Sequence, residues 1–290
     1  MKKILLIVII LSVMFVTGCN SEITKNNLNS IYVIDNGQFG EETTINYPNV
    51  ISQAPNYFVN DTIESNKTII INDVEWELKY RDTLYYPVGS KQVHRYFVNG
   101  DENKKVLLDN YGEINSILFK FATLEISKNA TSSEVLELLK PELAKIVDIT
   151  FYKDIIMPQD SSNTSGFGIY DYKFYNQKNG YITDYLNVSI SSEDGSVFGL
   201  KINNLSATNI ELDINKEKEK QAIDLKLKDI VSITNIGEYI SYEVCFPPMV
   251  KEYENQLYIM HFVSPKYMSE NGETSGAIQT LLIPVELISN

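Results

Sequence analysis

The sequence predicts an α+β protein dominated by antiparallel sheet, built from tandem modules in which a helix leads into a meander of strands. Three observations predict this fold. Apolar residues mostly alternate with polar ones, turn residues separate the short apolar runs, and two longer segments have helical periodicity instead. The chain of 290 residues is 43% hydrophobic, which is enough for one large domain or two to three small ones.

The N-terminus carries the strongest motif. Two lysines precede an apolar run over residues 4–16, and the segment Val16-Thr17-Gly18-Cys19 ends it. A positive start, a short apolar core and small residues before a cut site are typical of a secretory signal. The segment resembles the bacterial lipoprotein signal, in which a diacylglycerol is joined to the cysteine thiol and the chain is cleaved just before it. The resemblance implies a signal peptide over residues 1–18 and lipid attachment at Cys19. An ordinary signal or an uncleaved anchor is the alternative.

Residues 19–59 are predicted to be the lipidated N-terminus and a polar tether. Residues 20–29 are rich in Asn and Ser and lack apolar periodicity, as flexible linkers do. Two acyl chains on Cys19 are enough to hold a protein firmly on a membrane. The abundance of Ile, Asn, Lys and Tyr suggests an AT-rich genome, so we expect the extracytoplasmic face of a Gram-positive cell membrane.

The predicted mature chain is acidic. Loss of the signal removes two lysines, so the formal net charge changes from −13 to −15. An acidic chain without a basic run repels phosphate backbones, which argues against nucleic acid as a partner. The acidic residues either aid solubility or bind cations of the cell wall, and solubility is the favoured interpretation.

The N-terminal β-rich module, residues 60–126, is predicted from alternation. Val74, Trp76, Leu78 and Tyr80 alternate with charged residues, which is typical of a half-buried strand with Trp76 in the core. Gly112 closes a turn between apolar strands, where a tight hairpin demands positive φ. Further strands are expected over residues 93–98, 106–109 and 114–121.

A helix over residues 131–147 is expected to open the second module, residues 127–210. Thr131 with Glu134 matches a capping box, an apolar stripe follows, and Pro141 is expected to kink the helix or divide it. Strands are expected over residues 169–175, 181–190 and 197–202, with Gly195 in the last turn.

The third module, residues 211–290, opens with a helix that is expected to begin near Asp213 or Asn215 and to run to Asp229. Pro247 and Pro248 are expected to end the strand that precedes them. Strands are expected over residues 240–246, 257–263 and 277–285, with a longer polar connection over residues 264–276.

A helix followed by a meander whose final hairpin holds an acidic residue and a glycine resembles the PepSY-like modules of exported Gram-positive proteins. The resemblance covers residues 127–205 best, through the helix 131–147, the strands 186–190 and 197–202, and the turn Glu193-Asp194-Gly195. It covers residues 213–287 less well, and residues 60–121 share the meander without a leading helix. Such modules are similar to small α+β inhibitor-like domains. The resemblance therefore implies a module that binds or restrains proteins outside the membrane, and it carries over no catalytic residue.

Catalytic and metal-binding patterns are sparse. His94 and His261 are the two histidines, neither has zinc-site spacing, and His261 shares the parity of its apolar neighbours, which favours a core or edge histidine. No Gly-x-Ser-x-Gly elbow occurs, and the acidic pairs at residues 101–102 and 193–194 lie in hairpin turns, where backbone reasons favour acids. We therefore predict no catalytic residue, no metal and no cofactor, although loops far apart in sequence could still build a pocket.

With Cys19 lipidated, Cys245 is left without a partner for an intramolecular disulfide. Its place at the end of an apolar strand favours a buried small residue over a nucleophile.

Tyrosine is abundant, with 19 in the chain, so some tyrosine is expected on the surface. The first candidate for a binding surface is Tyr170, Tyr172 and Tyr175 together with the loop over residues 159–168. The favoured alternative is strand propensity in an AT-rich genome.

Together these features predict a membrane-anchored, non-catalytic module that binds or inhibits a protein partner. The alternative is an extracellular enzyme, or an accessory subunit, acting on cell-wall polymer. A solute receptor is disfavoured because the alternating βα pattern of such receptors is missing. A deep cleft between two lobes would favour the receptor, and a flat or concave sheet face would favour protein binding.

Overall fold

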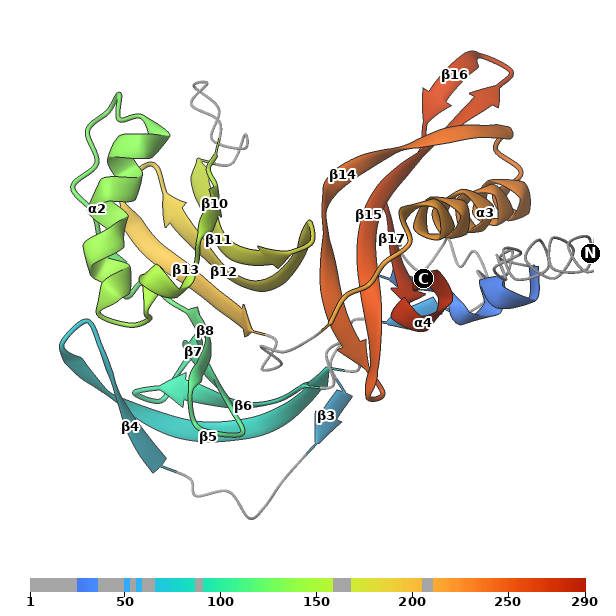
Figure 1. Cartoon of the computed structure of the whole chain (residues 1–290). Helices are drawn as coiled ribbons and strands as arrows, with labels where there is room; N and C mark the ends of the chain where they lie inside the picture. The colour runs from blue at the N-terminus through green and yellow to red at the C-terminus, as the bar shows by residue number, and fades with distance from the viewer. Residues whose placement is uncertain are drawn as a thin grey trace, which may run out of the picture.

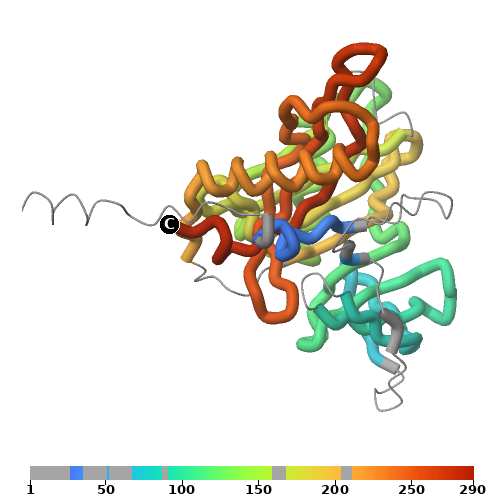
Figure 2. Tube along the Cα trace, turned by 90° about the vertical axis from the view of Figure 1, so that its right-hand side faces the viewer, coloured from blue at the N-terminus to red at the C-terminus, as the bar shows by residue number. Residues whose placement is uncertain are grey.

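The computed structural model of the chain describes residues 25–35, 50–52, 56–58, 66–86, 91–158, 168–204 and 211–290. It is α+β and dominated by strands, as the sequence predicts. The strands are hydrogen-bonded into one mixed sheet that bends into two halves (Figure 1). Figure 2, turned by 90°, shows the long orange helix, Lys216–Thr234, beside the blue N-terminal elements and away from the teal strands. The predicted signal peptide, Cys19 and most of the loop over residues 159–168 lie outside the described residues.

The N-terminal half combines the first two predicted modules. Its two groups of strands join where β13 pairs with β8 through Leu200 and Ile117. The first group comprises β4 (Asn66–Ile71), β5 (Val74–Tyr86), β6 (Lys91–Val98), β7 (Asp101–Asp109), β8 (Ile114–Leu118) and β9 (Ala122–Thr123). The second comprises β10 (Asp154–Ile156), β11 (Ile169–Lys178), β12 (Tyr181–Ser191) and β13 (Ser196–Asn204), with α2 (Ser132–Ala144) and η2 (Ile149–Phe151) before them.

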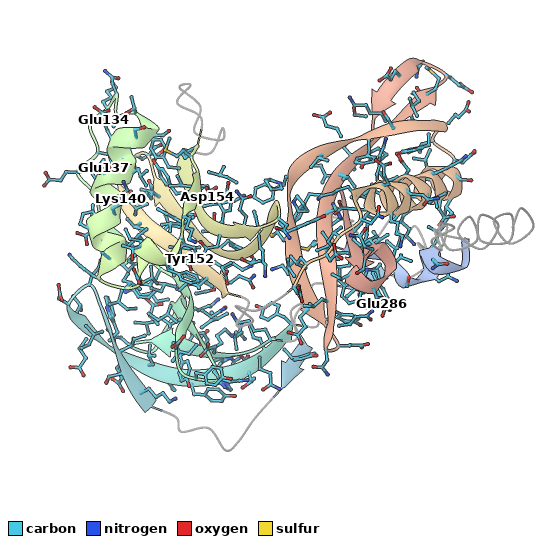
Figure 3. The ribbon with its side chains drawn as sticks, in the orientation of Figure 1. Glu134, Glu137, Lys140, Tyr152, Asp154 and Glu286 are labelled. Carbon is cyan, nitrogen blue, oxygen red and sulfur yellow. The ribbon has the colours of Figure 1, made fainter. Side chains whose placement is uncertain are left out.

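The α2 helix begins at the predicted capping box. The backbone N–H of Glu134 donates to Thr131 Oγ1, and the Glu134 carboxylate accepts the backbone N–H of Thr131 at 2.7 Å. One of the two expected effects of Pro141, division of the helix, does not occur. Proline has no N–H to donate to the carbonyl oxygen of Glu137, but Glu137 is exposed, so water can hydrogen-bond that oxygen instead. Glu137 and Lys140 (Figure 3) form an ion pair at 2.6 Å.

The core of the N-terminal half lies between α2 and the sheet. Tyr172 of β11 and Leu186 of β12 are fully buried there against the apolar face of α2. On β5 the predicted alternation holds for Leu78, which is fully buried, and for Trp76, which packs against Phe119 at 5.1 Å between ring centroids. Val74 was expected inside and is 49% exposed, because it stands at the hairpin end of the strand.

The C-terminal half is built on α3 (Lys216–Thr234). Asn215 caps its first turn, as one of the two predicted starts, with its side chain accepting from two backbone N–H groups. The helix runs five residues beyond the expected end at Asp229 and stops at Asn235, whose φ of 51° is left-handed. The strands beneath it are β14 (Glu238–Tyr253), β15 (Gln256–Ser269), β16 (Gly272–Ser275) and β17 (Gln279–Pro284), followed by α4 (Val285–Ile288).

Two expectations about these strands are wrong. β14 continues past Pro247 and Pro248, because register shifts on either side of Phe246 accommodate the missing donors as bulges. The connection expected after residue 264 is instead an extension of β15 that pairs with β16 through a turn at Glu270 and Asn271, and Gly272, which follows the turn, has a φ of 104°.

Residues of the predicted tether range also enter the C-terminal half. β1 (Tyr32–Asp35) pairs with β17 and with β2 (Val50–Ser52), β3 (Asn56–Phe58) pairs with β5, and η1 (Lys25–Ser30) lies beside α3. Ile31 is fully buried in the core under α3, and the buried amine of Lys226 donates to the carbonyl oxygen of Leu28 at 3.3 Å. Leu28 and Ile31, which lie in the range predicted as a tether, are therefore part of the core under α3.

The two halves meet where β12 and β14 run parallel. Ile182 pairs with Met249 there, and both belong to a small cluster with Met260 and Leu282. This junction fixes how strands of the N-terminal half face β14 and β15.

Candidate functional site

A cleft of about 410 Å³ lies at the junction of the two halves, and we call it the lysine cleft. Strands β5 to β8 and β12 to β13 form one wall, and β14 and β15 form the other. Its lining residues are Tyr86, Lys91, Leu107, Asn115, Ser116, Leu118, Tyr185, Lys201, Ile202, Asn203, Met249, Lys251, Met260 and Phe262.

Strand alternation explains why lysines reach this cleft. Leu200 is buried in the core of the N-terminal half, so its neighbour Lys201 points to the opposite side. In the same way Val250 is buried under α3, so Met249 and Lys251 line the cleft.

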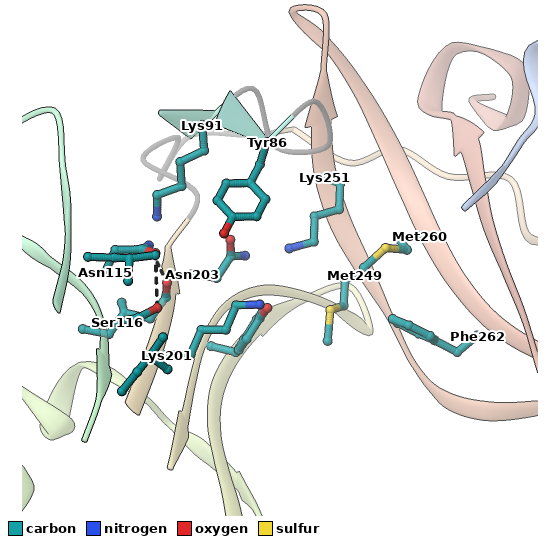
Figure 4. A pocket seen from close by; sticks show the side chains of 14 residues that line it. Tyr86, Lys91, Asn115, Ser116, Lys201, Asn203, Met249, Lys251, Met260 and Phe262 are labelled. Atoms are coloured by element: carbon teal, nitrogen blue, oxygen red, sulfur yellow. Dashed lines mark hydrogen bonds between the residues drawn. The ribbon is translucent and has the colours of Figure 1, made fainter. Parts of the chain in front are cut away.

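Three amines share the cleft. Lys251 is 7% exposed, Lys91 is half-buried and Lys201 is exposed. Lys91 and Lys251 extend from opposite walls with their amine ends directed inward (Figure 4). None of the ion pairs within the described part of the chain involves any of the three, and no carboxylate is among the lining residues.

The electrostatics of the amines follow from this arrangement. Burial, and then the charges of Lys201 and Lys91, lower the pKa of Lys251 to about 7. Burial also lowers the pKa of Lys91, with the charge of Asp109 opposing it, and the charge of Lys201 lowers it further. The Lys201 side chain is exposed to solvent as a whole, but the protein around its amine partly desolvates it and lowers its pKa too. The cleft is thus a positive site in an acidic protein.

Neutral polar groups complete the wall around the amines. The Asn115 amide donates to the carbonyl oxygen of Ile202 at 3.0 Å, which fixes its orientation, and Ser116 Oγ donates to Asn115 Oδ1 at 3.4 Å. The Tyr86 hydroxyl points into the same space (Figure 4). The Lys251 amine lies 5.1 Å from the centroid of the Tyr185 ring, a cation–π contact.

The wall formed by β14 and β15 is apolar apart from Lys251. Met249, Met260 and Phe262 line it, and Phe262 is held by an edge contact with Phe246 at 5.6 Å between centroids. Methionine side chains adapt to irregular shapes, so this wall can accept an apolar body.

The tyrosines predicted as a binding surface lie elsewhere, since none of the three lines the cleft. Tyr172 is fully buried, and its hydroxyl donates to the carbonyl oxygen of Ser132 at 2.8 Å, so its side chain is not accessible to a ligand. Tyr170 and Tyr175 are half-buried. Cys19, the predicted lipid attachment site, lies outside the described residues.

The expectation for Cys245 is wrong. The residue is exposed, with Sγ 3.7 Å from the carbonyl oxygen of Glu243, in a stretch of β14 where Glu243 and Val244 are exposed as well. Among the acids predicted to serve hairpin turns, Asp194 accepts the backbone N–H and the hydroxyl of Ser196 at 3.0 and 2.6 Å. These hydrogen bonds hold the pKa of Asp194 well below its usual range.

A second cluster of ionisable groups lies buried between α3 and the sheet. Glu219 accepts the Tyr181 hydroxyl at 2.7 Å, pairs with Lys216 at 3.2 Å and lies 3.3 Å from His261 Nε2. His261 is buried, which confirms the core position expected for it. Burial favours a higher pKa for Glu219, but the hydrogen bond from Tyr181 and the nearby groups of His261 and Lys216 outweigh it and lower the pKa. This cluster joins the helix to the sheet and takes no part in the cleft lining.

The side chains and helices of the structure also bear on metal binding and membrane crossing. Within the described ranges, no group of three or more His, Cys, Asp or Glu side chains is placed to hold a metal ion. None of the helices in the same ranges is both long and apolar enough to cross a membrane.

No protein-family model, no curated protein and no solved structure matches the chain. The lysine cleft could not be found from the sequence, because its lysines lie on strands 50 or more positions apart. The one local signal is Lys251, which follows Met249 and Val250 in an apolar part of its strand.

Proposed function

We propose that this protein is a non-catalytic binding protein, anchored on the extracytoplasmic face of the cell membrane, and that the lysine cleft is its binding site. The observation that carries the proposal is the cleft itself, which has a volume of about 410 Å³. Small-molecule sites are concave, occupy about 300–1,000 Å³ and combine apolar walls with a few convergent polar groups. The lysine cleft has each of these properties.

The lining supports binding better than catalysis. Its 14 residues contain no histidine, cysteine or carboxylate, so proton transfer there would fall to lysine and tyrosine alone. A lysine with a lowered pKa is a known type of nucleophile, but no histidine or carboxylate stands beside Lys251 in the lining to act as its base. An enzyme acting on cell-wall polymer stays the alternative, with Lys251 as the group that would carry its chemistry.

The shape of the site favours a ligand over a flat protein interface. The sequence alone favoured a protein partner and disfavoured a receptor for small molecules. A cleft between two halves admits a small molecule and excludes a folded surface, so we now place the receptor first and the protein-binding or inhibitory role second.

The anchor and the module arrangement are parts of the same proposal. Cys19 precedes the first residue of η1 by six positions, so attachment there keeps the body within about 20 Å of the lipid head groups. The α2 helix precedes β11 to β13, and α3 precedes β14 to β17, so each half pairs a helix with a following meander, in line with tandem modules of the PepSY-like type.

The proposal is tested by native mass spectrometry of the detergent-solubilised protein after incubation with a cell extract filtered below about 1 kDa. Leu118→Trp fills the cleft from its rim, and Leu138→Trp adds the same ring on the exposed face of α2 as a matched control. We expect a bound mass in the wild type and in Leu138→Trp that is lost in Leu118→Trp. A bound mass that persists in Leu118→Trp, or none in any variant, contradicts the cleft as the binding site. Release of a Cys19→Ala variant from the membrane fraction tests the anchor separately.

A further inference from the structure

We propose that the lysine cleft binds a small organic anion, whose carboxylate or phosphate lies between Lys91, Lys201 and Lys251 and whose apolar body packs against Met249, Met260 and Phe262. This inference rests on the proposed function, since it names the class of ligand for the same site.

The first argument is the charge of the cleft lining, which holds three lysines and no carboxylate, and the charge of Asp109 reaches Lys91 from outside the lining. The chain has 38 acidic and 25 basic residues, so such an excess of positive charge in one place is contrary to its overall composition. Other lysines have partners, such as Lys140 with Glu137 and Lys145 with Glu142. No carboxylate of the described chain takes that place in the cleft, where an external anion fits the charge.

The second argument is the burial of Lys251. An ammonium group taken out of water costs much free energy unless a partner compensates it, and within the described residues the Lys251 amine is paired with no carboxylate and faces the ring of Tyr185 at 5.1 Å. Burial first, and then the charges of Lys201 and Lys91, lower the pKa of Lys251 to about 7. A bound anion reverses each of these effects, and it draws a proton onto Lys251 when the pH lies above its pKa.

The third argument concerns the neutral donors beside the amines. Asn115 is fixed by its bond to Ile202, and Ser116, Asn203 and Tyr86 border the same space (Figure 4). Amide N–H and hydroxyl groups suit carboxylate and phosphate sites beside lysine, because they can donate hydrogen bonds to the oxygens of the anion.

The fourth argument fixes the rest of the ligand. A site for an inorganic ion needs only the polar wall, whereas here the opposite wall is formed by two methionines and a phenylalanine. An apolar body buried against Met249, Met260 and Phe262 gains affinity through the hydrophobic effect. We therefore expect an organic anion to bind more tightly than the inorganic ion that bears the same charge.

The test is isothermal titration calorimetry on the full-length protein in a neutral detergent. The probes are phenyl phosphate, hexanoate, inorganic phosphate and the uncharged hexanol. We expect phenyl phosphate to bind at least about tenfold more tightly than inorganic phosphate, and hexanol to show no binding. Titrations at pH 8 in buffers of different ionisation enthalpy should reveal proton uptake on binding, because Lys251 is largely neutral at that pH before the anion arrives.

Variants separate the cleft from the rest of the surface. Lys251→Met and Lys201→Gln should each weaken phenyl phosphate binding at least about tenfold, and proton uptake should disappear in Lys251→Met. Lys79→Gln removes an exposed lysine of β5 outside the cleft and should change the affinity by less than about twofold.

Three outcomes overturn the inference. Equal losses in Lys79→Gln and Lys201→Gln would show a general charge effect. Binding of hexanol but not of the anions, if Leu118→Trp blocks it, would support the cleft as a binding site but exclude an anion as its ligand. Binding of an acetylated tetraglutamate peptide without binding of phenyl phosphate would assign the site to an acidic protein segment.

Discussion

Replacing Lys251 with methionine should stabilise the unliganded protein, which is an unusual direction for a change at a buried residue. Methionine has a similar length and no branch, and its neighbours in the cleft include Met249 and Met260. The substitution removes a buried positive charge that has no anionic partner among the lining residues. It leaves the apolar packing of β14 in place.

The magnitude follows from the pKa. A fall from 10.5 to about 7 on folding corresponds to about 5 kcal/mol between the two protonation states, at about 1.4 kcal/mol per pKa unit. The folded pKa is below the unfolded one, so the unfolded chain binds more protons between pH 7 and pH 10.5, and wild-type stability rises with pH across that window. Below pH 7 the whole penalty is present. We expect Lys251→Met to raise the free energy of unfolding at pH 7 by about 2–4 kcal/mol.

The assay is urea unfolding followed by circular dichroism at pH 6.5, 8.0 and 9.5. The wild type should gain stability over this range, and the gain should be much smaller in Lys251→Met. Lys79→Met, at an exposed position on β5, is the matched control and should change stability by less than about 0.5 kcal/mol. A Lys251→Met variant that is less stable than the wild type at pH 7 would refute the reasoning, because it would show that the amine is compensated in the folded protein.

Three further predictions concern the packing of the two halves. Glu219→Gln should cost about 3 kcal/mol at pH 7, against less than about 0.5 for the exposed Glu217→Gln, and the cost should vanish in acid. The lowered folded pKa of Glu219 means that its stabilisation is present above the unfolded pKa and is lost as the pH falls through the folded one, which urea unfolding from pH 7 down to pH 3 would follow. Tyr172→Phe should lower the free energy of unfolding by about 1–2 kcal/mol through loss of its 2.8 Å hydrogen bond to the start of α2, and an unchanged urea midpoint would contradict that role. Gly195→Ala should lower the melting temperature strongly in a thermal scan, since φ is +67° and the added Cβ meets the carbonyl oxygen of Leu124 at 2.0 Å; a melting temperature within 2 °C of the wild type would be evidence against this close approach.

Local chemistry was enough to predict the elements with strong terminal signals. The capping box at Thr131, the cap at Asn215 and the hairpin glycine at residue 195 each act through hydrogen bonds or φ values within a few positions. The alternation in β5 likewise predicted the burial of Leu78 and the packing of Trp76, because burial on one face of a sheet imposes a period of two.

The errors occur where a long-range partner overrides a local tendency. β14 crosses Pro247 and Pro248 because β15 offers it hydrogen bonds on both sides of the prolines. Cys245 is exposed because none of the described elements covers that part of the strand, and Tyr172 is buried because α2 covers β11. The residues of a strand do not show by themselves whether another element of the fold packs on them.

The sequence by itself determined the α+β class, the positions of both long helices and most strands, and the acidic charge of the chain. Only the tertiary structure decided where a ligand could bind. Lys201 falls in the strand expected over residues 197–202, whereas Lys91 and Lys251 lie outside the expected strands. The three share a cleft only because β12 runs parallel to β14 at the junction of the halves. Their mutual repulsion and burial depend on distances in space, which no spacing along the chain encodes.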